Sequence, residues 1–171
     1  MLTRINIFGI IKDHFGTLKN FDTHKTSFGD ILLFFIIPII IAFILTYKEY
    51  TFENQLSNLI AGISIFGGFL FNLLAIIYSQ LESIEKKTEN MHDDHLQNLK
   101  VRYIKEIHAN ISFCIILSIA IVLGLFLTTI DFPKPFKIVF KIIIGIDYFM
   151  MMLFALTMLM VINRIYILLK R

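Results

Sequence analysis

Residues 141–164 read KIIIGIDYFMMMLFALTMLMVINR, and Asp147 is the one acidic residue of this apolar stretch. A run of this length and hydrophobicity is typical of a helix that crosses a bilayer, whose hydrocarbon core needs about 20 residues. The whole chain of 171 residues has the same character, with 57% hydrophobic residues and a mean hydropathy of +0.76. Because soluble domains contain about 45–50% apolar residues, the composition predicts an integral membrane protein.

The chain contains four such apolar windows, at residues 31–47, 59–78, 111–130 and 138–162. Lipid offers no hydrogen bonds to a peptide group, so each window must satisfy its own backbone, and these lengths suit helices. We therefore predict an all-α protein with a four-helix transmembrane domain over residues 29–171.

The basic residues predict how these helices are oriented. Of the 16 Lys and Arg residues, twelve lie before the first window, between the second and third, or after the last. The two remaining connections hold four. Since cytoplasmic connections are enriched in Lys and Arg, we expect a multi-pass protein with both termini and the long middle connection in the cytoplasm.

Two cytoplasmic segments flank the windows. Residues 1–28 contain apolar side chains at helical spacing among lysines, which indicates an amphipathic helix that either lies at the membrane surface or packs against the bundle. Residues 80–107 are charged but keep regularly spaced apolar side chains. We predict that they form a cytoplasmic stalk, a helical hairpin that extends the second and third helices.

Small and polar residues follow one face of the second predicted helix at alternating spacings of four and three. They are Ser57, Ala61, Ser64, Gly68, Asn72, Ala75 and Ser79. Small residues at this period let helix backbones approach closely in lipid, so the stripe predicts a helix–helix contact. The alternative is that Ser64, Asn72 and Ser79, repeated around a homo-oligomer, line a narrow wet path. Asn72 and Asn110 are expected to pin helices by hydrogen bonds.

Asp147 is the strongest single candidate for function. We expect it near the bilayer midplane, at the level of Gly67, Gly68 and Pro38. Pro38 should kink the first helix at this level. An ionised carboxylate in hydrocarbon is costly. Asp147 therefore either faces a gated path or is a neutral structural acid, capped by Ser64 or by the backbone near the two glycines.

The stalk supplies the candidates for binding a cytoplasmic protein partner. They are Lys86, Lys87, His92, His95, Lys100, Arg102 and Lys105. Acidic residues interleave with these bases, so we do not expect direct nucleic-acid binding. Turn residues like the His and Asp residues at 92–95 are common, whereas a zinc site normally needs three or four ligands that converge. The single cysteine, Cys114, allows no internal disulfide. We expect neither a metal, a cofactor nor an enzymatic activity.

Two stretches carry a resemblance to a known group of proteins. The first-helix sequence DILLFFIIPIII (residues 30–41) and the stalk-forming FNLLAIIYSQLESIEKK (residues 71–87) resemble the small four-span membrane proteins of bacterial anti-phage defence systems. Examples are the membrane accessory of RNA-targeting CRISPR loci and the membrane subunit of Kiwa. The resemblance implies an inner-membrane protein that receives a signal on its cytoplasmic side and alters permeability or positions an effector.

Three functions are open from the sequence. The first is a homo-oligomeric effector that alters membrane permeability when it is triggered through the stalk. The second is a non-conducting membrane anchor or sensor that docks a soluble effector. The third is a small proton-coupled transporter, which would require Asp147 to exchange protons.

Overall fold

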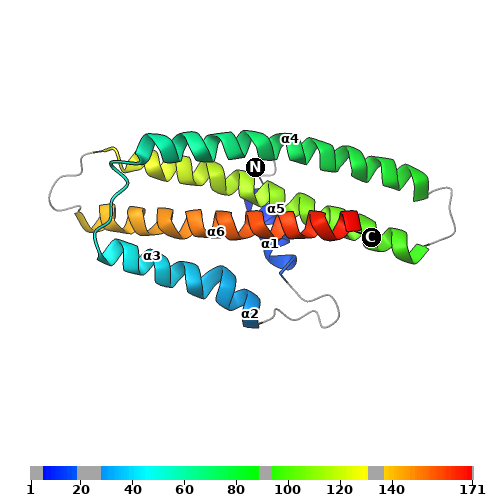
Figure 1. The fold of residues 1–171 in the computed structure, drawn as a ribbon, viewed down its shortest axis with the longest axis horizontal. Coiled ribbons are helices and arrows are strands. Elements are labelled where there is room, and N and C mark those ends of the chain that lie inside the picture. The colour runs from blue at the N-terminus through cyan, green and yellow to red at the C-terminus, as the bar shows by residue number, and fades with distance from the viewer. Residues whose placement is uncertain (1–5, 19–27, 89–93, 131–136, 171) are drawn as a thin grey trace.

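The computed structural model describes residues 6–18, 28–88, 94–130 and 137–170, and every regular element in these ranges is helical. The elements are α1 (Ile7–Gly16), α2 (Phe28–Ile31), the π-helix η1 (Leu32–Ile36), α3 (Ile37–Tyr47), α4 (Leu56–Thr88), α5 (Asp94–Leu127) and α6 (Lys137–Lys170), shown in Figure 1.

The described chain contains four helices that are long and apolar enough to cross a membrane. They cover Phe28–Tyr47, Leu56–Glu82, Lys100–Leu127 and Lys137–Leu168. The prediction of an all-α chain with four such helices is confirmed.

Pro38 shapes the first of these helices. A proline inside a helix lacks an N–H donor, and its ring clashes with the carbonyl group four residues earlier. The helix adapts through the five-residue π-helix Leu32–Ile36, which ends just before the α3 turn that contains Pro38. The irregularity that the sequence predicts at Pro38 is therefore a widened turn on its N-terminal side.

The four long segments pack in the order α3, α6, α5 and α4 (Figure 1). Each has close backbone contacts with the next in this order, and the described residues show none between α3 and α4. As a result α5 and α6 are flanked on both sides, while α3 and α4 occupy the two ends of the arrangement.

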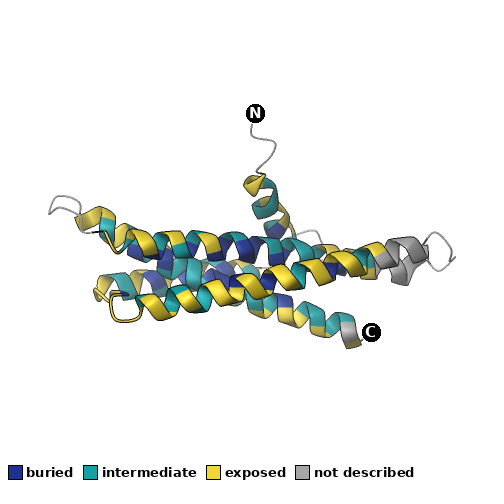
Figure 2. Cartoon of the chain, turned by 90° about the horizontal axis from the view of Figure 1, so that it is seen from above, coloured by how far each residue is buried: buried dark blue, intermediate teal, exposed yellow. Residues whose placement is uncertain are grey.

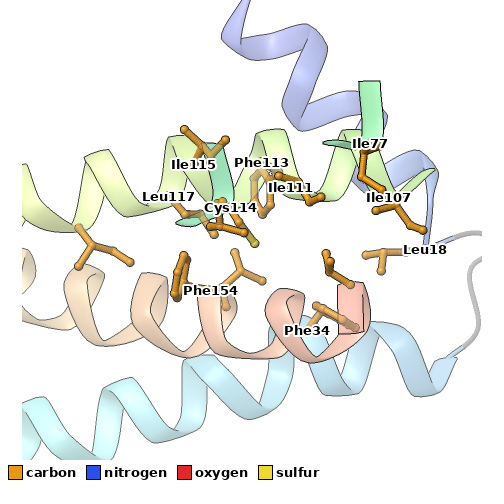
Figure 3. Packing of buried hydrophobic residues seen from close by; sticks show 14 of the residues in the cluster. Leu18, Phe34, Ile77, Ile107, Ile111, Phe113, Cys114, Ile115, Leu117 and Phe154 are labelled. Atoms are coloured by element: carbon orange, nitrogen blue, oxygen red, sulfur yellow. The ribbon is translucent and has the colours of Figure 1, made fainter. Parts of the chain in front are cut away.

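Burial follows this order. Half of the most apolar window of α5 is buried, against 11% of that of α4, so α4 is largely an outward-facing helix (Figure 2). The buried apolar cluster follows α5 through Ile107, Ile111 and Cys114 and meets Phe154 of α6 (Figure 3). The described fold is thus built around α5.

Helices α4 and α5 continue beyond their apolar windows. Helix α4 runs on from Glu82 to Thr88, and α5 begins at Asp94, six residues before its window starts. This continuation confirms helical structure in the predicted stalk. The turn predicted between the two helices, at residues 89–93, lies outside the described residues, as do the side chains of residues 83–99.

Helix α1 packs against the bundle at one end only. At its C-terminal end, Leu18 is buried and the Phe15 ring lies 5.3 Å from that of Phe35 and 5.9 Å from that of Phe113. At its N-terminal end, Phe8 is 86% exposed, and the helix projects away from the bundle (Figure 2). The sequence left open whether this helix lies at the membrane surface or packs against the bundle. Its last turns pack against the bundle.

Candidate functional site

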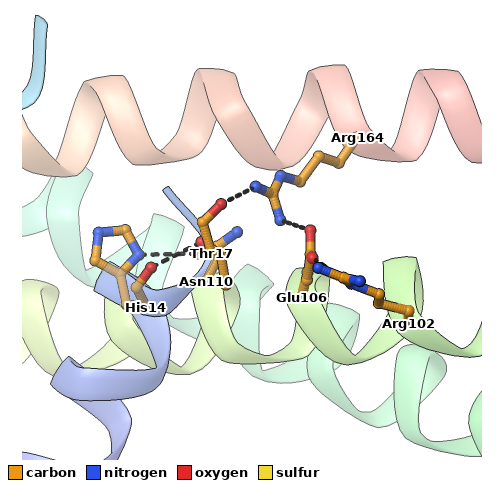
Figure 4. A network of polar contacts seen from close by, with 6 residues as sticks. All are labelled: His14, Thr17, Arg102, Glu106, Asn110 and Arg164. Atoms are coloured by element: carbon orange, nitrogen blue, oxygen red, sulfur yellow. Dashed lines mark hydrogen bonds and ion pairs between the residues drawn. The ribbon is translucent and has the colours of Figure 1, made fainter. Parts of the chain in front are cut away.

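A polar network joins the C-terminal end of α1 to α5 and to the C-terminal part of α6 (Figure 4). The Nδ1 atom of His14 lies 2.8 Å from Oδ1 of Asn110, and the Thr17 hydroxyl lies 2.9 Å from the same oxygen. Arg164 pairs with the Glu106 carboxylate and donates to the Thr17 carbonyl at 2.7 Å. Three helices distant in the sequence are thereby held by one set of contacts.

His14 is the most deeply inserted residue of α1, with no exposed surface. Its ring stacks on that of Phe113 at a centroid distance of 3.8 Å. Burial lowers the pKa of His14 to about 4, against an opposing contribution from its contact with Asn110, and the positive charge of Arg164 lowers it further. The imidazole is therefore neutral at neutral pH, which suits its stacked position.

Arg164 completes the C-terminus of α1. The last carbonyl groups of a helix have no partner within the helix, and a cation there also interacts favourably with the helix dipole. The Arg164 guanidinium fills both roles at Thr17, the C-cap residue of α1. Its pairing with Glu106 is partly buried, at 14% and 22% side-chain exposure, so this residue has a structural role in addition to the topological one that the sequence predicts.

Sequence reasoning missed this network, although α5 carries a signal for it. Arg102, Glu106, Asn110, Cys114 and Ser118 recur every four residues, so each lies one turn from the next in a row that winds slowly around the helix. The row runs from the charged stalk into the apolar span. The hydrogen-bonding role predicted for Asn110 is confirmed, but its partners belong to α1.

Asp147 lies inside the chain's own bundle. It is 1% exposed and faces α5, where a Cβ atom added to Gly124 would overlap its carboxylate. Both of its oxygen atoms lack a hydrogen-bond partner among the described residues. The capping predicted at Ser64 or at the Gly67–Gly68 backbone is not seen, because Ser64 and Gly68 point outward and Gly124 receives the acid instead.

The small and polar stripe of α4, hereafter the α4 stripe, faces away from the bundle. All seven of its members are exposed, including Ser64, Gly68 and Asn72. A Cβ atom on Gly68 would meet nothing within 4 Å, whereas one on the neighbouring Gly67 would approach Oγ of Ser118 on α5 to 3.0 Å. The structure therefore separates the predicted site residues, with Gly67, Pro38 and Asp147 inside and the stripe outside.

The stalk candidates are only partly described. Lys100, Arg102 and Lys105 are exposed on α5, and the Arg102 Nε atom lies 3.3 Å from Oε1 of Glu106. The described structure gives no side-chain positions for the candidate residues at 86, 87, 92 and 95. Within the described residues no group of three or more potential metal ligands converges.

Comparison with known proteins gives no further guide to this site. No protein-family model, characterised protein or solved structure shows significant similarity to the chain.

The contact between Gly124 and Asp147 predicts that substitution of Gly124 by Ala destabilises the bundle. The added methyl group must displace a buried carboxylate, and overpacking of this kind costs about 1–3 kcal/mol. Thermal unfolding of the detergent-solubilised protein measures the effect. Gly62→Ala is the matched control, because a Cβ at that position meets nothing within 4 Å.

The same contact also predicts a rescue. Asp147→Ala should relieve most of the destabilisation caused by Gly124→Ala. The double variant should therefore unfold at a higher temperature than the sum of the two single decreases predicts. Additive losses would show that the two residues do not meet.

The buried position of His14 predicts that the docking of α1 depends on pH. The docked pKa of about 4 lies below the ordinary value of 6.5, so the undocked helix binds more protons between these values. Docking is thus full above pH 6.5 and weakens as the pH falls towards 4, by up to about 3 kcal/mol. Fluorescence anisotropy of a probe on Phe8→Cys follows the release of α1, since Cys114 is buried.

The control for this titration is His14→Gln, which keeps hydrogen-bonding groups beside Asn110 but cannot titrate. Its anisotropy should stay level between pH 7 and 5. An equal pH response in both proteins would assign the titration to another group.

Proposed function

We propose that the protein is a homo-oligomeric membrane effector in which the α4 stripes of several copies meet, and that the assembly alters the permeability of the membrane. The observation that carries this proposal is the outward orientation of the α4 stripe, on a helix that is outermost in the packing order.

The stripe is poorly suited to face lipid. Asn72 lies within the apolar helix Leu56–Glu82, it is exposed, and its amide has no hydrogen-bond partner in the described part of the chain. An unpaired amide in hydrocarbon costs several kcal/mol. A second α4 helix would offer it a partner, and Gly68, one turn away with open space beside it, would let the two backbones approach closely.

The arrangement also supports a polar path. Ser64, Asn72 and Ser79 succeed one another along the exposed face of α4. Around an axis of three or more copies they would form rings of hydroxyl and amide groups, which is how narrow pores offer substitutes for water. Asp147 lies away from this face, so we assign it to the contact between α5 and α6 rather than to the path.

The trigger is proposed to reach the assembly from the cytoplasmic side. The resemblance described above implies a bacterial inner membrane, and the positive-inside pattern predicts that the stalk and both termini are cytoplasmic. There Lys100, Arg102 and Lys105 present an exposed charged surface at the base of the stalk for a protein partner. The resemblance of the first helix and of the stalk-forming sequence to membrane proteins of anti-phage defence systems supports such a role.

One observation favours the second function, a non-conducting anchor or sensor. A groove of about 1210 Å³ lies between α1, α4 and α5, and its lining includes Lys12, Asp13, Tyr78 and His108. A groove of this size at the root of the stalk could receive a segment of a soluble effector. The α4 stripe would then only hold copies together.

Oligomerisation through the α4 stripe is tested by two matched substitutions. Ala75→Ile adds bulk within the stripe and should dissociate the complex, whereas Ala155→Ile adds the same bulk to an exposed position of α6 and should not. Light scattering of the protein in detergent gives the mass. A wild-type monomer, or equal effects of the two variants, would contradict the proposed interface.

Permeability is tested by ion flux into liposomes that contain the purified protein. Asn72→Leu should reduce the flux at least tenfold while Asp147→Asn retains it, because only Asn72 faces the proposed path. A stable oligomer without flux, even when its cytoplasmic partner is supplied, would favour the anchor. If Asp147→Asn lost the flux while its oligomeric mass stayed unchanged, Asp147 would belong to the conducting path.

A further inference from the structure

A groove of about 600 Å³ lies between the C-terminal end of α1, the helix α2 with η1, and α6. We call it the α1–α6 groove. Its polar lining consists of Thr17, Asp30, Asn163 and Arg164. It lies on α6 and the first span, away from α4, so its role is independent of the proposed oligomer.

The position of these polar residues matches the depth of lipid headgroups. Asp30 is the third residue of the apolar helix Phe28–Tyr47, and Arg164 lies four residues before the end of Lys137–Leu168. These two helices are in contact and run in opposite directions (Figure 1). The first residues of one and the last of the other therefore lie at the same end of the bundle, where hydrocarbon gives way to headgroups.

The groove becomes apolar away from that end. Leu33 lines it one turn beyond Asp30, while Leu159 and Leu156 line it one and two turns before Arg164. A ligand that fits this gradient has a polar head and an apolar tail that runs parallel to the helices. A volume of about 600 Å³ lies in the range of ordinary small-molecule sites and accommodates a headgroup with the first part of its chains.

The two charges of the groove define the headgroup. The Arg164 guanidinium has five N–H donors, and its contacts with Glu106 and with the Thr17 carbonyl leave donors for a further acceptor. The Asp30 carboxylate is half-buried, close enough for its charge to act on Arg164, and has no bonded partner within the described structure. The site thus offers donors for a phosphate beside an acceptor for a cation.

We propose that the α1–α6 groove binds a phospholipid with a primary ammonium headgroup, of the phosphatidylethanolamine kind. The phosphate accepts from Arg164, the ammonium donates to Asp30, and one acyl chain lies along Leu33, Leu156 and Leu159. A phosphatidylglycerol carries a net negative charge that Asp30 repels. A phosphatidylcholine has no N–H donor for the carboxylate.

The test is native mass spectrometry of the full chain in detergent with phosphatidylethanolamine, its mono-, di- and trimethylated forms, and phosphatidylglycerol, all with the same acyl chains. The wild-type protein should bind the unmethylated lipid about fivefold more tightly than the trimethylated one, as expected for one partly exposed charge-assisted hydrogen bond. Each added methyl group should weaken binding. Equal binding across this series would overturn the proposal without any variant.

Asp30→Asn keeps the shape of the side chain and removes its charge. The ratio of the affinities for the unmethylated and the trimethylated lipid should then be close to one. Asp13→Asn is the matched control, because Asp13 is exposed on α1 and lies outside this groove. It should leave the preference unchanged. A preference that survives in Asp30→Asn, or is lost equally in both variants, would refute the assignment of the ammonium to Asp30.

Soluble phosphoethanolamine separates a lipid from its free headgroup. Because it lacks the chains that would cover the leucines, it should bind at least about tenfold more weakly than the lipid. Equal affinity would show that the site takes a soluble zwitterion and not a lipid.

Discussion

The fold depends on the burial of α5. This helix is flanked by α4 and α6 and crossed by α1, so polar groups in its apolar part, such as Asn110 and Ser118, are buried inside the protein. In such surroundings each polar group must find a partner inside the chain or bear the cost of having none. Asn110 meets His14 and Thr17, and Glu106 meets Arg164. The route of α1 across the bundle follows from these requirements.

The same constraint explains the contrast between Asn110 and Asn72. Both are asparagines within apolar helices, but Asn110 is fully buried with its Oδ1 atom paired, while Asn72 is exposed and unpaired in the described chain. In the packing order α3, α6, α5 and α4, the described residues give α4 one neighbour, α5. A polar residue on its free side has no partner among the described residues of its own chain, which is why we look to other copies of the protein.

Charge is concentrated where the helices leave the apolar region. The pair between Arg164 and Glu106 links α6 to α5 at that boundary, Arg102 pairs with Glu106 within α5, and Asp30 lies at the same end on the first helix. A charged group there retains part of its hydration, so ion pairs at this depth cost less than they would at the midplane. The residues that dock α1, those of the proposed lipid site and those at the base of the stalk are therefore neighbours.

The sequence by itself determined the class of the fold. Four apolar windows separated by charged connections leave helices as the stable solution, and the length of the second and third helices follows from the pattern of residues 80–107. Proline chemistry likewise predicted an irregular turn at Pro38. The periodicity of the sequence did not determine what each helix face contacts. A stripe of small residues has the same spacing whether it packs against its own chain or against another copy. Only the tertiary structure placed Asp147 against Gly124, Gly67 against Ser118 and the α4 stripe outside, since these positions depend on the order in which the helices pack.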